Sequence, residues 1–284
     1  MSIPAFPAPS LSDVDLAAAL VAGAGAVLRG LREAVDAEGG RFVASELKDA
    51  GDAAAQAWLA AAFSRARPGD AVLSEEAGDD LSRLEADRVW IVDPLDGTRE
   101  FAERHARGGA AGQWRDDFAV HVALWERDGG LTAGAVGLPA RDAVLSTADG
   151  RTPAGVEHVL DGRRPLRIAA SRSRPPAFVT ALAERGDVEL VPMGSAGVKV
   201  VSVVDGTVDA YLHAGGQYEW DSAAPVAVAR AAGLDCTRLD GSPLRYNRQD
   251  PWLPDLFVCH PALAAHLRAA LVQAGVDIKE GAQP

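Results

Sequence analysis

RVWIVDPLDGTREF, residues 88–101, begins as an apolar strand and ends in a turn that carries two carboxylates, Asp93 and Asp96. Pro94 fixes its own φ, and Gly97 allows the backbone to approach a ligand closely. Both carboxylates can therefore converge where the strand ends. Bare carboxylates a few ångströms apart repel each other, which raises the pKa of one of them. The alternative is an ordinary Asp-Pro turn at the surface.

A hard cation removes this repulsion. Mg²⁺ prefers oxygen ligands at about 2.0–2.1 Å, and the Leu95 carbonyl is placed to join such a shell. A second apolar strand, residues 71–74, leads into Glu75 and Glu76, a pair that taken alone is more typical of a solvated turn. Asp221 begins an apolar helix, where the alternative role is an N-cap.

Four of these side chains, Glu75, Asp93, Asp96 and Asp221, together carry a charge of about −4 at neutral pH. That charge matches two Mg²⁺ ions, the arrangement that serves in-line phosphoryl transfer. We therefore predict a two-metal site.

Composition excludes several other classes of protein. The chain has 284 residues, 48% of them hydrophobic, which suits one large domain or two small, closely packed ones. Its net charge of −12 disfavours a nucleic-acid polymer or an anionic membrane as the main partner. Cys236 and Cys259 lack metal-type spacing, so reduced thiols in the core, and with them a cytoplasmic protein, are expected rather than a disulfide. The N-terminus has no basic region before its apolar run, and no stretch reaches the ~20 apolar residues that span a bilayer.

The apolar periodicity predicts a mixed α/β (α+β) chain. Two helices are expected in the first seventy residues, the second after Asp52, followed by strands. The Gly-, Pro- and charge-rich segment 152–165 is the best boundary, which gives an N-terminal half, 1–160, and a C-terminal half, 161–284, where strands and helices alternate. The strands expected in the first half are 71–74, 88–93, 118–127 and 134–150.

Two motifs together resemble the signatures of one enzyme family. WIVDPLDGTREF, residues 90–101, and WDSAAPVAVARAAG, residues 220–233, are similar to the paired signatures of the lithium-sensitive, Mg²⁺-dependent phosphatases related to inositol monophosphatase. The resemblance extends over nearly the whole chain. It implies a layered α–β–α–β–α sandwich with the metals between its halves, and it favours a homodimer.

The resemblance also assigns roles to individual residues. Asp52 and Thr98 would align the attacking water, although Asp52 alone could be a helix cap, and Glu76 would lie next to the metal ligands. The amides of Gly97 and Thr98, if they begin a helix, would hold the scissile phosphate. Two or three Mg²⁺ ions are implied, with the ligands Glu75, Asp93, Leu95, Asp96 and Asp221.

The chain departs from the family pattern just before Asp52. Lys48 and Asp49 stand where related enzymes usually have a Pro-Val-Thr-like stretch. This difference affects what the resemblance implies about a third metal ion, and affects less what it implies about the two-metal core.

The substrate is suggested by further similarities. DGTREF resembles the DGT-Lys-Glu-Phe form of CysQ-type 3′(2′),5′-bisphosphate nucleotidases, with Arg99 conserving the charge. Lys199 matches a lysine common in those enzymes, and an extra cation suits a second phosphate; a solvated lysine is the alternative.

Other candidate substrate contacts lie in the second half. Ser171 and Arg172 are a candidate anion site, because arginine binds phosphate oxygens bidentately, or part of a solvated loop. Tyr246 would line a base pocket or belong to the core. His121 and His213 are expected to be structural. The segment 102–115 is either a lid over the anion or a plain loop.

We therefore expect a Mg²⁺-dependent phosphatase that converts adenosine 3′,5′-bisphosphate to AMP and phosphate, and that also acts on its sulfated precursor in sulfur assimilation. Direct attack by water is expected, since no Cys, His or Ser stands in a nucleophile arrangement. The alternatives are an inositol monophosphatase or fructose-1,6-bisphosphatase, and a nucleotide-binding protein that does not hydrolyse its ligand.

Overall fold

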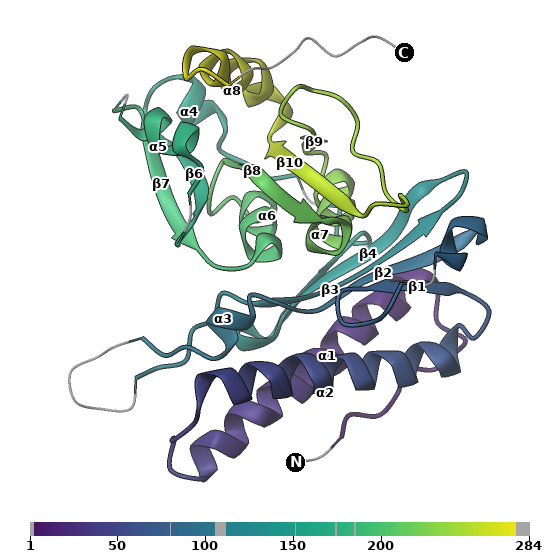
Figure 1. Cartoon of the computed structure of the whole chain (residues 1–284). Helices are drawn as coiled ribbons and strands as arrows, with labels where there is room; N and C mark the ends of the chain where they lie inside the picture. The colour runs from purple at the N-terminus through teal and green to yellow at the C-terminus, as the bar shows by residue number, and fades with distance from the viewer. Residues whose placement is uncertain are drawn as a thin grey trace.

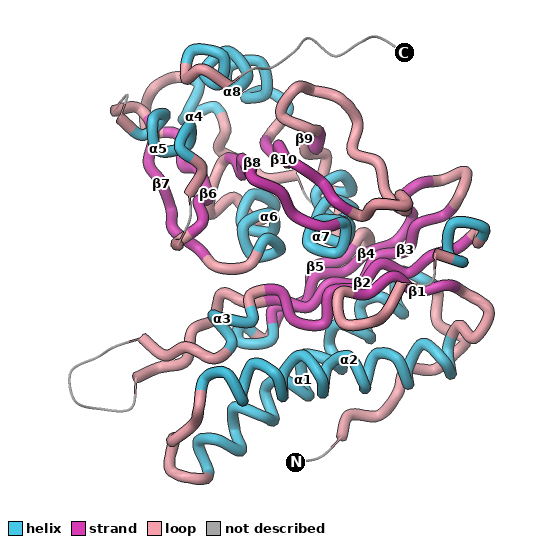
Figure 2. The backbone as a smooth tube through the Cα atoms, viewed as in Figure 1, coloured by secondary structure: helices cyan, strands magenta, loops and turns pink. Residues whose placement is uncertain are grey.

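The computed structural model describes residues 3–79, 81–105, 112–150, 152–173, 175–184 and 186–276. These residues form five alternating layers: helices, a sheet, helices, a second sheet and helices again (Figure 1, Figure 2). The predicted layered sandwich is confirmed. The expected lid, 102–115, lies partly outside the described residues.

The first sheet contains five strands in chain order. The first pair is parallel and the other neighbours are antiparallel. The prediction of one strand over 134–150 was wrong, because Pro139 begins a short 3₁₀ helix, Pro139–Arg141, that divides it into two antiparallel strands. The strands are β1 (Ala71–Ser74), β2 (Arg88–Asp96), β3 (Ala119–Glu126), β4 (Gly130–Leu138) and β5 (Ala143–Ser146).

Two long helices, α1 (Asp13–Ala37) and α2 (Ala44–Ala66), cover the outer face of this sheet. Ser12 caps α1 by accepting a hydrogen bond from the Asp15 amide at 3.1 Å. By length and composition α1 could span a bilayer, but one of its faces is buried in the core, as in the core helix of a globular protein. Because α2 begins at Ala44, Asp52 lies inside the helix, and the cap alternative for Asp52 is wrong.

The second sheet has the strand order β7-β6-β8-β10-β9. Helices α6 (Ala196–Val204) and α7 (Glu219–Ala231) lie between the two sheets (Figure 1), and their valines and alanines form the central core. The outer layer contains α4 (Glu157–Leu160), α5 (Ala177–Ala183) and α8 (Pro261–Gln273). The strands are β6 (Leu166–Ser171), β7 (Val188–Met193), β8 (Ala210–Tyr218), β9 (Asp235–Thr237) and β10 (Trp252–Cys259).

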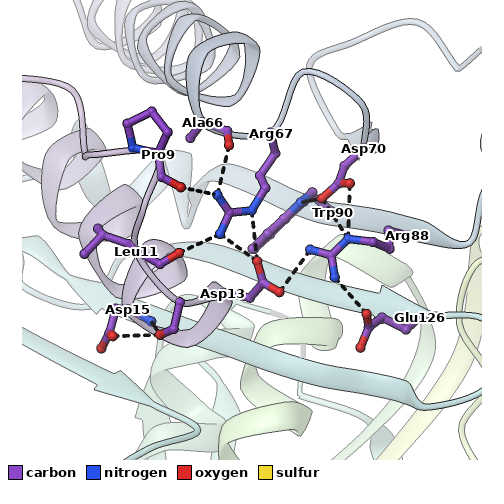
Figure 3. A network of polar contacts seen from close by, with 11 residues as sticks. Pro9, Leu11, Asp13, Asp15, Ala66, Arg67, Asp70, Arg88, Trp90 and Glu126 are labelled. Atoms are coloured by element: carbon purple, nitrogen blue, oxygen red, sulfur yellow. Dashed lines mark hydrogen bonds and ion pairs between the residues drawn. The ribbon is translucent and has the colours of Figure 1, made fainter.

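An ion-pair network fixes the start of β2 to the helical layer (Figure 3). Arg88 pairs with Asp13 at 3.0 Å, Asp70 at 3.1 Å and Glu126 at 2.8 Å. Arg67, just after α2, donates a second ion pair to Asp13 at 2.8 Å. Each carboxylate of this network therefore has a guanidinium partner.

The second sheet is built entirely from residues that follow the segment 152–165, and the first sheet from residues that precede it. The division at 160/161 remains a prediction, because the helices α6 and α7 of the second half also pack against the first sheet. Cys236 and Cys259 are both free and buried, as predicted.

Candidate active site

The end of strand β2 places two buried carboxylates on one side. Asp93 pairs in register with His121 and Asp96 with Ala119, and the register shifts between them. In a regular strand, residues three apart point to opposite faces; a bulge lets both face the same side. Asp93 is 1% exposed and Asp96 8% exposed, so the surface-turn alternative is wrong, and the strand continues through Asp96.

Asp96 is held from the helical layer between the sheets. Its Oδ2 accepts hydrogen bonds from the Ser195 hydroxyl at 2.5 Å and from the Gly197 amide at 2.8 Å. Ser195 also caps α6, because its Oγ accepts from the Val198 amide at 3.0 Å. Ser195 was not predicted as a site residue; a serine before an apolar helix was the available signal.

Asp93 is only half satisfied. Its Oδ1 accepts from the Leu95 amide at 3.0 Å, while its buried Oδ2 has no hydrogen-bond partner among the residues that the structure describes. Burial, then the charges of Asp96 and Glu75, raises the pKa of Asp93 well above its ordinary value. A buried carboxylate oxygen without a partner is costly, so this atom favours binding of a cation.

Glu75 and Asp221 approach the same place from different halves of the chain. Glu75 follows β1, and Asp221 lies in the first turn of α7, where it accepts from the Tyr218 amide at 2.6 Å. Asp221 therefore caps the helix from inside it. Burial, together with the charge of Asp96, raises the pKa of Asp221 to about 7. Desolvation and the charges of Asp221 and Asp96 raise the pKa of Glu75 to about 7 as well, although water reaches this exposed side chain.

These four carboxylates fit a divalent cation. Among the described residues, none of them has an arginine or lysine within ion-pair distance. The donors are carboxylate oxygens, the ligands Mg²⁺ prefers, and the Leu95 carbonyl lies in the same segment. These carboxylates repel one another, and no arginine among the described residues compensates their charge. A bound cation would relieve this repulsion.

His121 lies directly against this cluster. Its Nδ1 is 3.1 Å from the Trp220 carbonyl, which only accepts, so Nδ1 carries the proton of the neutral ring. Its Nε2 is 3.3 Å from Asp96 Oδ2. Ligand atoms of Asp93, Asp96 and His121 lie within 4.8 Å of one another. His121 was expected to be structural, and the structure places it beside the site.

Asp52 and Thr98 lie together on another side of the cluster. Burial, then the charges of Glu76 and Asp49, raises the pKa of Asp52 to about 6, against the opposing effect of a hydrogen bond with Thr98. The Thr98 hydroxyl is also 3.2 Å from the Leu95 carbonyl, so its single proton can serve either oxygen. Glu76 is exposed beside them. Gly97, at φ +89°, precedes the one-turn helix α3 (Thr98–Phe101), which begins at Thr98 as expected.

A polar cavity of about 580 Å³ lies next to the carboxylates. It brings together most of the predicted substrate contacts from both halves of the chain. Its lining contains only one large apolar side chain, so it suits an anion better than an apolar group. The lining residues are Gly97, Thr98, Arg99, Glu100, Ser171, Arg172, Ser173, Met193, Gly194, Ser195 and Lys199.

The cavity lining contains three cationic side chains, Arg99, Arg172 and Lys199, which differ in how free they are to bind a phosphate. Lys199 is 6% exposed and donates to the carbonyls of Gly194 at 3.1 Å and Ser195 at 2.7 Å, so the alternative of a solvated lysine is wrong. Arg172 pairs with Glu100 at 2.6 Å and Glu103 at 2.5 Å. The guanidinium that was expected to bind phosphate is thus already neutralised. Arg99 is exposed and forms no ion pair within the described part of the chain.

Tyr246 does not line this cavity. It is 6% exposed, lies in the central core, and its hydroxyl is 3.2 Å from that of Ser222. Of the two roles predicted for Tyr246, the structure therefore supports the place in the core. His213 is partly buried, and its Nε2 is 3.0 Å from the Gly216 carbonyl.

Comparisons with known proteins identify relatives that are similar to this chain. The model of the inositol monophosphatase family matches residues 10–274. The chain is 51% identical over 236 residues to a Mycobacterium bovis protein named 3′-phosphoadenosine 5′-phosphate phosphatase, covering 80% of this chain and 83% of that one. It is 34% identical over 190 residues to the Escherichia coli K12 3′(2′),5′-bisphosphate nucleotidase CysQ, covering 64% of this chain and 72% of that one.

Solved structures agree as well. CysQ from Bacteroides thetaiotaomicron superposes with a TM-score of 0.67 at 27% identity, over 85% of this chain and 94% of that one. Thermotoga maritima IMPase superposes with a TM-score of 0.72 at 19% identity, over 95% of this chain and 100% of that one, a likeness of fold alone.

Proposed function

Because the chain belongs to the inositol monophosphatase family, we propose that it is a Mg²⁺-dependent phosphatase that removes the 3′-phosphate of adenosine 3′,5′-bisphosphate, producing AMP and phosphate. The observation that carries the proposal is a set of carboxylates without arginine partners beside a polar cavity. The name of the 51% identical relative supports the choice of substrate.

The metal ligands would be Glu75, Asp93, Asp96 and Asp221 with the Leu95 carbonyl. The partnerless Asp93 Oδ2 and the raised pKa values of Asp93 and Asp221 support this assignment. Mg²⁺, when bound, neutralises the carboxylates and stabilises negative charge on the phosphate oxygens. Two ions balance the cluster, and a third remains part of the proposal.

The chain's own groups would direct water at the phosphorus. Asp52 and the Thr98 hydroxyl orient the water, and Asp52, with its pKa near 6, accepts the proton as general base. Glu76 adds negative charge near Asp52 and keeps this pKa high. The amides of Gly97 and Thr98 are donors for the phosphate. Water would then attack directly, without a covalent intermediate; Cys236 and Cys259 are buried and are not among the residues that line the cavity.

A second phosphate would be bound on another part of the cavity wall. Arg99 is exposed there, and Lys199 uses two of its three donors on backbone carbonyls. Ser171 contributes a polar side chain to the same wall. Arg172 would contribute by exchanging one of its glutamate partners. We further propose that the enzyme acts in the cytoplasm, as a homodimer, and also on the sulfated precursor of its substrate in sulfur assimilation.

The test is phosphate release by the purified protein in Mg²⁺, with adenosine 3′,5′-bisphosphate, inositol 1-phosphate and fructose 1,6-bisphosphate compared by kcat/KM. We expect a preference of at least about a hundredfold for the nucleotide, or about 2.7 kcal/mol in the transition state. A preference for either of the other esters would assign the chain to another branch of the family. Nucleotide binding without any phosphate release would indicate a binding protein.

A further inference from the structure

The candidate metal site takes its ligands from two halves of the chain, and a buried arginine links these two halves. Glu75 lies in the loop between β1 and the short 3₁₀ helix Ser82–Glu85, and Asp221 lies in α7. Nothing in the local sequence fixes the distance between these two carboxylates. The sheet sets part of it, because the Glu75 amide donates to the Val92 carbonyl of β2 at 3.3 Å and α7 packs against β2, and a contact between the loop and α7 adds to it.

Arg83 provides the first part of this contact. It is 1% exposed, and its Nη1 donates to Asn247 Oδ1 at 2.6 Å and its Nη2 to the Arg248 carbonyl at 2.8 Å. The guanidinium also pairs with Asp79 of its own loop at 2.7 Å. Arg83 and Asn247 are separated by 164 positions in the chain. One buried side chain thus binds the loop of Glu75 to a distant segment.

Glu219 provides the second part. It is 0% exposed, and its carboxylate accepts from the Asn247 amide at 2.6 Å and from the Arg248 amide at 2.8 Å. Glu219 begins α7, two positions before Asp221. The connection therefore runs from Asp79 through Arg83 and Asn247 to Glu219, and so from one half of the metal cluster to the other.

This connection is a poor source of stability alone. Burying charges costs about as much as their attraction returns, and replacing such groups by apolar ones is often neutral. Asn247 has φ +58° and Leu81, beside Arg83, has φ +61°, so both backbone positions are also strained. The connection therefore has a role other than stability. Because it ends beside Glu75 and Asp221, this role is to position the two carboxylates.

We propose that Arg83 is a positioning residue: through Asn247 and Glu219 it sets the separation of Glu75 and Asp221 and thereby the affinity of the site for a divalent cation. The inference rests on the proposed metal site but adds a residue that contacts neither metal ligand. Replacing Arg83 would release the Glu75 loop from α7 while leaving all four carboxylates in the chain.

The experiment is titration of the metal-free protein with Mn²⁺, with free Mn²⁺ measured by electron paramagnetic resonance. Three variants are compared with the wild type. Arg83→Met keeps the apolar stem and removes every donor. Asn247→Gly removes the Oδ1 acceptor and relieves the positive φ, so it remains informative if Arg83→Met does not fold. Arg88→Met is the matched control, because Arg88, like Arg83, bonds three other residues, but it lies at the end of β2 remote from Asp93 and Asp96 (Figure 3).

We expect Arg83→Met to weaken Mn²⁺ binding at least about tenfold and Asn247→Gly severalfold, with Arg88→Met within twofold of wild type. Unchanged affinity in both site variants would overturn the positioning role while leaving the metal site intact. Equal weakening in Arg88→Met would also overturn it, since the effect would then follow general destabilisation. Absence of Mn²⁺ binding by the wild type would instead refute the metal site itself.

Discussion

Carboxylates cluster at both ends of strand β2. In the part of the chain that the structure describes, Asp13, Asp70 and Glu126 at the Arg88 end are paired with arginine, whereas Glu75, Asp93, Asp96 and Asp221 at the other end are not. At the Arg88 end, Asp13 receives hydrogen bonds from Arg67 and Arg88, and although burial alone would raise its pKa, these bonds lower it (Figure 3). At the other end, Asp93 has a raised pKa and an oxygen without a partner. One strand thus carries a balanced network and an unbalanced one.

This difference in pairing distinguishes carboxylates that stabilise the fold from carboxylates that bind a ligand. A network with matched charges is complete without any ligand and ties α1 and α2 to the sheet. Carboxylates that repel one another in a buried place destabilise the fold unless a cation or protons neutralise them. The unbalanced end is therefore where a ligand is needed, so substitutions at the two ends should affect different properties of the protein.

The largest effect is expected from Asp93→Asn. The amide keeps the shape but removes the charge of the most buried member of the cluster, so the cation that the chemistry requires is no longer held. Such stabilisation is worth several kcal/mol, and each 1.36 kcal/mol is tenfold, so kcat should fall by about a thousandfold or more at every Mg²⁺ concentration. Steady-state phosphate release checks this. An active Asp93→Asn enzyme would refute the assignment of the metal site.

Asp52→Asn should have the next largest effect, about a hundredfold in kcat/KM, the loss typical of a general base. The carboxylate must be ionised to accept a proton, so wild-type activity should fall as the pH drops through its pKa of about 6. In Asp52→Asn, the rate should be low and should no longer fall as the pH drops through 6, so the acid limb of the pH profile should disappear. A pH profile of Asp52→Asn that keeps the limb would assign it to another group.

Much of the fold was predictable because it follows local patterns. The apolar stripes of α1 and α2, the Ser12 cap and the alternation of elements after 165 are short-range features. The hairpin of β4 and β5 was missed because both strands are apolar and the interruption is only Pro139–Arg141. The start of α2 was missed because the polar turn before Asp52 does not interrupt the helix.

The carboxylates of the site were predictable from two motifs, but their support was not. Asp93 and Asp96 share a side because of a register shift, and no composition signal marks a bulge. Ser195 reaches Asp96 across 99 positions, and Arg172 is neutralised by Glu100 and Glu103 from the other half. Such pairings depend on how the two sheets are packed, which single-strand patterns do not specify.

At the balanced end, Arg88→Met should lower the free energy of unfolding by about 2 kcal/mol, because three partly buried carboxylates lose a charged hydrogen-bond partner. Its kcat/KM should stay within twofold of wild type. Urea unfolding and phosphate release measure the two effects. Lost activity in a folded Arg88→Met protein would show that the two ends of β2 are coupled, against the separation drawn here.

A further expected effect is a slope of stability with pH in the metal-free protein. The raised pKa values of Asp93 and Asp221 mean that the folded state keeps protons that the unfolded chain has lost above pH about 5. Stability should therefore fall as the pH rises from about 5 to 7, by about 1.4 kcal/mol per pH unit for each proton retained.

Mg²⁺ should reverse this trend, since it replaces the protons and binds more tightly as the carboxylates ionise. Asp52 and Glu219 also have raised pKa values, so part of the slope will persist in Mg²⁺. The decisive quantity is the gain in Tm on adding Mg²⁺, which should increase between pH 5 and 7 in the wild type and be nearly flat in Asp93→Asn. A gain that does not depend on pH would mean that the cation binds elsewhere, and that the unpaired carboxylates of β2 are neutralised by protons alone.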